Sequence, residues 1–232
     1  RMASLKDIRK RIDSVKRTQK TTSAMKMVSA AKLRRSEDNI REATPYAVKL
    51  KSVVSSLSTR FDGVEQDTGF GRLFRSSGGK RTGVILVTSD RGLCGGFNAN
   101  LSKALARQLD EEGVECAEMV ILGRKGNDFY KRTNHTILEN HTGTHPEEQL
   151  GLVRDIVSEF TKRFEANELD QVSLAYNHFV SVMTQEPVIE QLLPIKAPEA
   201  ESADEREIIF EPSPEDILET LLKKYVQNQV YV

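Results

Sequence analysis

Apolar residues recur along the first 57 positions with the spacing of a coiled-coil seam. Leu5, Ile8, Ile12 and Val15 occupy the two core positions of a heptad repeat. The same register continues without a shift at Leu33, Ile40, Ala43, Ala47, Leu50, Val54 and Leu57. This pattern is typical of a coiled coil, not of a helix lying on a globular core. A helix from Leu5 to Leu57 would be about 80 Å long, so we expect it to extend away from the body of the protein.

The centre of this seam is polar. Between Val15 and Ile40 the core positions hold Leu33 and five polar residues, namely Gln19, Thr22, Lys26, Ser29 and Ser36. One interpretation is a weak patch that is tolerated because the apolar ends hold the helix pair together. The other is a rod enclosed by other proteins, which must not adhere too firmly to any one surface.

Pro45 lies inside this pattern, where a proline removes a backbone donor and bends a helix. Because Ala47, Leu50 and Val54 resume in phase, we expect the helix to continue through a kink near Thr44. The next residues, 59–80, contain five glycines among polar residues and indicate a linker.

The remainder alternates strand and helix patterns. Apolar runs predict strands at 83–88, 118–122, 172–183 and 187–195 with a weaker one at 136–138, and helices at 99–112, 126–132 and from 146 onward. This alternation predicts an α/β fold with a largely parallel sheet. An acidic loop is expected at 196–207, and Ser213-Pro214-Glu215-Asp216 predicts another helix start. The chain stops at Val232 within this last pattern, and we expect a truncated helix.

Charge is distributed unevenly along the chain. Residues 1–36 hold twelve basic and two acidic residues, a net charge of +10, and the whole chain is neutral, so the remainder carries −10. A basic rod joined to an acidic remainder favours an acidic partner. Nucleic acid is disfavoured because the positive residues surround the rod. No apolar run approaches 18 residues and the N-terminus lacks a signal-peptide pattern, so we expect an intracellular protein without a membrane span.

Candidate catalytic and ligand-binding residues are few. The loop from Asp90 to Asn98 follows a predicted strand, but its glycines at 92, 95 and 96 fit neither the dinucleotide fingerprint nor the P-loop, so we expect a structural turn. Cys94 is a candidate nucleophile, although a buried, inert thiol is the simpler interpretation. Spacings of six and four keep His135, His141 and His145 off one common face and argue against a metal site. With only two cysteines there is no disulfide framework. We therefore predict no catalytic, cofactor or metal site.

Several stretches together resemble the gamma subunit of F-type ATP synthases. The N-terminal motifs are Ile8-Arg9-Lys10-Arg11-Ile12-Asp13-Ser14-Val15, Thr18-Gln19-Lys20 and Ala24-Met25-Lys26-Met27-Val28-Ser29-Ala30-Ala31-Lys32-Leu33. Further along are Ser89-Asp90-Arg91-Gly92-Leu93-Cys94-Gly95-Gly96-Phe97-Asn98, Gly123-Arg124-Lys125-Gly126, Leu192-Leu193-Pro194 and Tyr225-Val226-Gln227-Asn228-Gln229-Val230-Tyr231. The similarity covers nearly the whole chain.

The resemblance implies a fold with five segments. These are an N-terminal shaft helix (1–58), a linker (59–81), a Rossmann-like α/β foot domain (82–196), an acidic loop with a short strand (197–212), and the start of a C-terminal helix (213–232). In the family the two terminal helices form an antiparallel coiled coil inside a hexamer of α and β subunits. The foot lies with the ε subunit on the ring of c subunits. The complex sits on the cytoplasmic face of the bacterial inner membrane or an equivalent energy-coupling membrane.

The resemblance also implies a rotor without cofactor or catalytic residues. Met25 and Lys26 fall where the family's shaft faces the acidic lever of β, Arg9 and Arg11 fall higher in the hexamer, and Lys32 is a further subunit contact. Phe210 and Glu211 match the family's contact with the c ring.

Two departures from the family pattern carry expectations. The family's C-terminal helix continues well beyond Tyr231, and no redox cysteine pair is present in this sequence, so we expect no thiol regulation. The alternative function is a free coiled-coil adaptor with an inert α/β head.

Overall fold

The computed structural model describes residues 4–60, 71–74, 78–114, 117–196 and 214–231. The described residues form two compact units, one that ends at Tyr46 and one that begins at Ala47. The first unit is the larger part of helix α1 (Leu5–Arg60), and the second contains the end of α1 and the α/β region. The predicted boundaries of shaft, linker and foot stay predictions.

Helix α1 is continuous through Pro45. The side chain of Thr44 donates a hydrogen bond from Oγ1 to the carbonyl oxygen of Ile40 at 2.7 Å, one turn back. Back-bonding of this kind often bends helices, and the predicted kink at this point stays a prediction.

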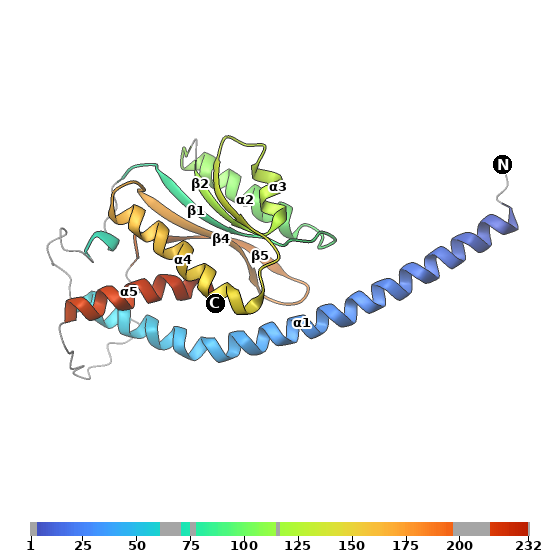
Figure 1. Ribbon diagram of the computed structural model, residues 1–232, viewed down its shortest axis with the longest axis horizontal. Coiled ribbons are helices and arrows are strands. Elements are labelled where there is room, and N and C mark those ends of the chain that lie inside the picture. The colour runs from blue at the N-terminus through green and yellow to red at the C-terminus, as the bar shows by residue number, and fades with distance from the viewer. Residues whose placement is uncertain (1–3, 61–70, 75–77, 115–116, 197–213, 232) are drawn as a thin grey trace. The chain divides into compact units, whose positions relative to one another are not determined.

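The sheet has five strands in the order β3-β2-β1-β4-β5 (Figure 1). Strands β1 (Thr82–Val87), β2 (Glu118–Leu122), β3 (Thr136–His141) and β4 (Gln171–Phe179) pair in parallel, and β5 (Gln185–Leu193) pairs antiparallel with β4 at the edge. The expected α/β fold with a largely parallel sheet is therefore confirmed. The strand predicted at 172–183 is too long, because β4 ends at Phe179.

The turn that ends β4 carries no glycine or proline. Instead, the hydroxyl oxygen of Ser181 accepts hydrogen bonds from the backbone N–H groups of Met183 and Thr184 at 3.3 and 3.1 Å. The backbone N–H of Thr184 also donates to the Ser181 carbonyl at 3.1 Å. A serine side chain thus supplies the turn chemistry that glycine usually supplies.

Helices cover both faces of the sheet. Helices α2 (Phe97–Glu111) and α3 (Arg124–Tyr130) lie on one face, where Leu101, Leu105 and the fully buried Tyr130 pack on Leu86 and Ile121. Helix α4 (Pro146–Glu165) covers the other face, where Phe160 packs in a second cluster with Ile85. Gly83 faces this cluster, and a Cβ there would lie 2.8 Å from Phe160. A short 3₁₀ helix (Gly71–Phe74) adds the buried Leu73.

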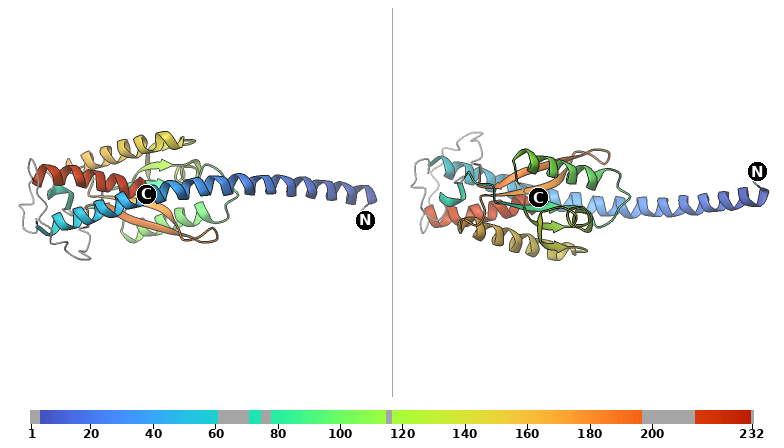
Figure 2. Two further views of the ribbon diagram at one scale, coloured as in Figure 1. Left: turned by 90° about the horizontal axis from the view of Figure 1, so that it is seen from below. Right: turned by 90° about the horizontal axis from the view of Figure 1, so that it is seen from above.

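The last turns of α1 belong to the same cluster as helix α5 (Pro214–Tyr231). Leu50 and Val54 are buried there together with Leu222, Tyr225 and Val226, and Figure 2 shows the two helix segments side by side. Leu50 and Val54 are both seam positions of the heptad pattern. The pattern therefore identified the side of α1 that is buried, but the expectation that this side does not lie on a globular core is wrong for Leu50 and Val54, which pack in the core of the second unit.

Candidate functional site

The helical segment from Leu5 to Tyr46 has no buried residue, and within it only Leu33 and Ala43 are half-buried. Its seam residues Leu5 and Val15 are 77% and 67% exposed. A helix of this length in isolation draws little stability from propensity, because most helical stability in proteins comes from packing an apolar face. Packing within its own unit therefore leaves the apolar seam residues of this segment largely uncovered.

The contact residues predicted on this segment are all exposed. Arg9, Arg11, Lys26 and Lys32 have exposed side chains, and Met25 is 51% exposed. None of the basic side chains in this described segment forms an ion pair within the chain. Phe210 and Glu211 lie outside the described residues.

Three threonines in the polar part of the segment bond to their own helix. The hydroxyls of Thr18, Thr21 and Thr22 donate to the carbonyl oxygens four residues earlier, those of Ser14, Arg17 and Thr18, at 3.1, 3.1 and 2.9 Å. Thr22 is one of the polar seam positions, so its hydroxyl proton is used within the helix. The central seam positions are polar in sequence, but fewer of their hydroxyl protons are available to a partner than the residue types suggest.

A second group of polar residues gathers at the carboxyl end of β1, where the family-like motif from Ser89 to Asn98 forms a loop. Asn98 Oδ1 accepts from the backbone N–H of Ser89 at 2.9 Å, and Asn98 Nδ2 donates to Ser89 Oγ at 2.8 Å and to Cys94 Sγ at 3.1 Å. The Ser89 hydroxyl donates to the carbonyl of Arg91 at 2.6 Å. The loop is thus closed by its own side chains.

The tip of this loop is exposed. Leu93 has a φ of +64° and is 94% exposed, and Gly95 follows with a φ of +58°. Cys94 is a free, exposed cysteine, so the expectation of a buried thiol is wrong. The reason is that residues 91–96 of the loop are all exposed and do not fold back on the core.

Asp90 connects this loop to two neighbouring strand ends by hydrogen bonds. Its Oδ1 accepts from the backbone N–H of Arg124 at 3.0 Å, just after β2, and its Oδ2 accepts from Gly143 at 2.8 Å, just after β3. Between them, Gly123 has a φ of +104°, and a Cβ at Gly123 would collide with the Thr88 carbonyl oxygen. Glycine is therefore required at position 123 by its backbone conformation and by the close approach of Thr88.

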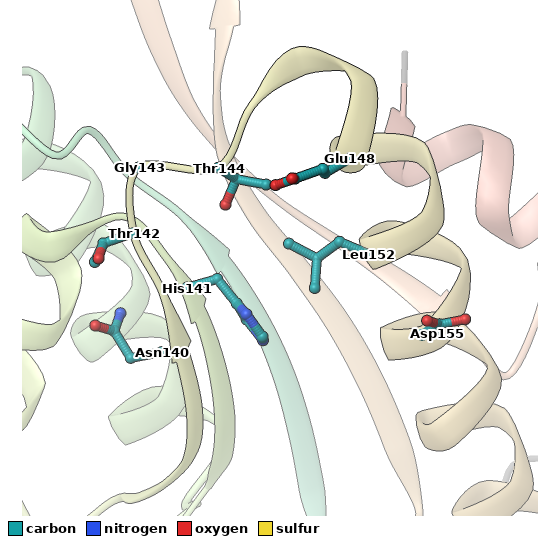
Figure 3. Close-up of a pocket in the computed structure, with 8 residues that line it drawn as sticks. All are labelled: Asn140, His141, Thr142, Gly143, Thr144, Glu148, Leu152 and Asp155. Atoms are coloured by element: carbon teal, nitrogen blue, oxygen red, sulfur yellow. The ribbon is translucent and has the colours of Figure 1, made fainter.

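A hollow of about 560 Å³ lies beside the end of β3 and the start of α4 (Figure 3). Figure 3 shows His141 and Leu152 pointing toward each other across it, with Glu148 directed toward Thr144. His141 Nε2 lies 2.7 Å from Glu139 Oε2. No lysine or arginine of the described chain lines the hollow.

The three histidines considered for a metal site do not meet. His135 Nδ1 accepts from the backbone N–H of Ala117 at 3.0 Å, and burial lowers the pKa of this imidazole. His141 pairs with Glu139, and His145 precedes α4. Among the residues that the structure describes, no group of three or more His, Cys, Asp or Glu side chains is arranged to hold a metal ion.

Comparisons with known proteins agree on one family. A family model described as ATP synthase matches residues 4–232. The ATP synthase gamma chain of Pelotomaculum thermopropionicum is 38% identical over 231 residues, which cover 99% of this chain and 79% of the relative. The ATP synthase gamma chain of Geotalea uraniireducens is 44% identical over 234 residues, with the same coverage of 99% and 79%.

One solved structure supports the fold. The central stalk and c ring of the Tetrahymena thermophila mitochondrial ATP synthase contain a chain that superposes with a TM-score of 0.61 at 20% identity. The superposition covers 91% of this chain and 89% of that one.

Proposed function

The chain belongs to the ATP synthase gamma chain family, and from that membership we propose that it is the non-catalytic rotor subunit of an ATP synthase. In this role it transmits rotation of the c ring to the catalytic β subunits. The observation that carries the proposal is the basic helical segment 5–46, which has exposed apolar seam residues and no buried residue of its own.

The proposed shaft is enclosed by three α and three β subunits. Its exposed apolar residues meet partner surfaces, and its net charge of +10 over residues 1–36 favours acidic ones. A charged surface interacts diffusely, because Coulomb energy changes slowly with distance. A shaft held in this way can rotate past successive partner surfaces, because no single large apolar contact has to be broken.

The predicted contact residues keep their roles in this proposal. Met25 and Lys26 face an acidic segment of β, while Arg9, Arg11 and Lys32 meet other parts of the hexamer. All five are exposed, which such contacts require.

The α/β unit is the proposed foot. It binds the ε subunit and the c ring, the latter through Phe210 and Glu211, and it holds the protein on the cytoplasmic face of the bacterial inner membrane or an equivalent membrane. In the described part of the chain, no helix is long and apolar enough to cross a membrane.

Native mass spectrometry of this chain mixed with the α and β subunits of its own complex tests the proposal. We expect an assembly of three α, three β and one copy of this chain that hydrolyses ATP. Failure to bind α and β, or binding without a single-copy stoichiometry, would overturn the proposal.

A matched pair of charge reversals sharpens this test. The double substitution R9E/R11E is expected to weaken assembly, most clearly at low salt, where charge attraction is least screened. The control K103E/R107E makes the same charge change at exposed positions of α2 and is expected to leave assembly unchanged. Equal effects of both pairs would point to net charge instead of a contact at Arg9 and Arg11.

A further inference from the structure

His135 lies immediately before β3 and uses one ring nitrogen as a hydrogen-bond acceptor. Its Nδ1 accepts from the backbone N–H of Ala117 at 3.0 Å. An imidazole nitrogen accepts only when it carries no proton, so this bond requires a neutral ring with its proton on Nε2. The bond is therefore sensitive to pH, which a bond between two backbone groups is not.

Ala117 is held by two successive residues of the segment that leads into β3. Besides the bond to His135, its carbonyl oxygen accepts from the backbone N–H of Thr136 at 2.9 Å, and its side chain is fully buried. The next residue, Glu118, is in register with Thr136 and begins the pairing of β2 with β3. His135 thus fastens the connection between α3 and β3 to the amino end of β2.

In the described part of the chain, titratable groups of α2 and α3 face His135. Tyr130 of α3 is fully buried, its ring centroid lies 5.7 Å from that of His135, and its hydroxyl donates to a backbone carbonyl of α2 at 2.9 Å. Asp110, exposed near the end of α2, acts on the imidazole through its negative charge. Glu118 of β2 is instead directed to Arg163 of α4. Asp110 is therefore the carboxylate that a protonated ring would meet.

We infer that His135 is a pH switch: the neutral ring holds Ala117, and the protonated ring releases it and turns toward Asp110. Protonation places a proton on Nδ1, so two donors then point at each other and the hydrogen bond to Ala117 is lost. The negative charge of Asp110 gives the imidazolium an alternative partner. The connection between α3 and β3 is thus closed at neutral pH and opens in acid.

Burial determines where on the pH scale the switch lies. Removal from water lowers the pKa of His135, and the charge of Asp110 opposes this only partly. The folded state therefore favours the neutral ring, so the stabilisation is complete above the ordinary histidine pKa and is lost as the pH falls through the lowered value. The switch does not depend on the proposed function, because none of its residues is a proposed subunit contact.

Amide hydrogen exchange of Ala117 in the full chain tests the switch, with each rate divided by the intrinsic rate at the same pH. In the wild type we expect protection to fall about tenfold or more between pH 8 and pH 4, with the midpoint at which the His135 imidazole titrates by NMR. His135→Asn keeps an acceptor oxygen near the position of Nδ1 that does not titrate, so Ala117 should stay protected throughout. Asp110→Asn removes the negative charge, and the midpoint should move to lower pH.

His178→Asn is the matched control. His178 is exposed on β4, so this variant should keep the wild-type transition. Constant protection of Ala117 in the wild type would overturn the switch, and so would a transition that persists unchanged in His135→Asn. An unchanged midpoint in Asp110→Asn would overturn the role of Asp110. Assembly with α and β subunits tests the proposed function separately from all of these results.

Discussion

Arg81 and Asp170 are joined by three hydrogen bonds at the start of strands β1 and β4. Asp170 Oδ2 accepts from the backbone N–H of Arg81 at 2.8 Å and from Nε at 2.9 Å, while Oδ1 accepts from Nη2 at 2.7 Å. The Asp170 side chain is only 4% exposed. This pair fixes the point where two central parallel strands begin, since Thr82 is in register with Gln171.

Asp170→Ala is expected to destabilise the α/β unit by about 2–3 kcal/mol, because a buried acceptor for a charged donor and a backbone N–H is lost. Arg81→Lys keeps the backbone hydrogen bond and loses the two-pronged guanidinium contact, so we expect a smaller loss of stability than in Asp170→Ala. Urea unfolding of both variants measures the difference. Equal costs would mean that the backbone bond contributes nothing.

Asp90→Ala is expected to loosen the strand ends that its carboxylate joins. The backbone N–H groups of Arg124 and Gly143 lose their acceptor, so their amide hydrogen exchange should accelerate about tenfold or more. Amides in the middle of β1 serve as the internal control and should keep their protection. Uniform acceleration across the sheet would instead indicate global destabilisation.

Leu222→Ala is expected to weaken the packing of α5 against α4 and the end of α1. Leu222 is fully buried in the cluster that holds Leu50 and Val54, and truncating such a leucine costs about 2–5 kcal/mol. Limited proteolysis and urea unfolding should both show the loss. Lys224→Ala, at an exposed position of α5, should have little effect, and a similar loss in that variant would argue against the packing role.

Pro45→Ala is expected to stabilise α1, because proline in a helix interior costs about 3 kcal/mol relative to alanine. Helicity measured by far-UV circular dichroism and the midpoint of thermal unfolding should both rise. Asn39→Ala is the control at an exposed position of the same helix, where the gain should stay below about 1 kcal/mol. A larger gain at position 39 would mean that Pro45 is already accommodated without strain.

Glu190→Gln is expected to stabilise the protein more at pH 7 than at pH 4. Burial raises the pKa of the Glu190 carboxyl, and the nearby charge of His178 opposes this only partly. A raised folded-state pKa favours the protonated form, so stability is present in acid and falls as the pH rises through that pKa. The urea unfolding midpoints of the wild type and of Glu190→Gln at pH 4 and pH 7 measure this difference in stability. Glu186→Gln, an exposed position on the same strand, is the control, and an equal gain from E190Q at both pH values would contradict the cause.

The sequence predicted the strands well where the buried residues form continuous apolar runs. The apolar run 118–122 predicted β2 to the residue, and that at 83–88 predicted β1 within one residue. Leu50 and Val54 were predicted on the buried side of α1 because heptad periodicity reports which side of a helix packs.

Features that depend on individual side chains could not be predicted from the sequence. Nothing in the pattern indicates that Ser181 would close the turn after β4, since serine is common in many contexts. Likewise, Asp90 contacts residues 34 and 53 positions away, and such pairs depend on which strands become neighbours.

The back-bonded threonines of α1 have a consequence for sliding friction. A hydroxyl already held by a carbonyl of its own helix, as Thr22 is held by Thr18, presents mainly its methyl group to a neighbour. In the proposed rotor, one neighbouring surface would be exchanged for another without leaving a hydroxyl donor at these positions unpaired. Resistance to movement there would come from weak dispersion contacts, which are lost and regained in small steps.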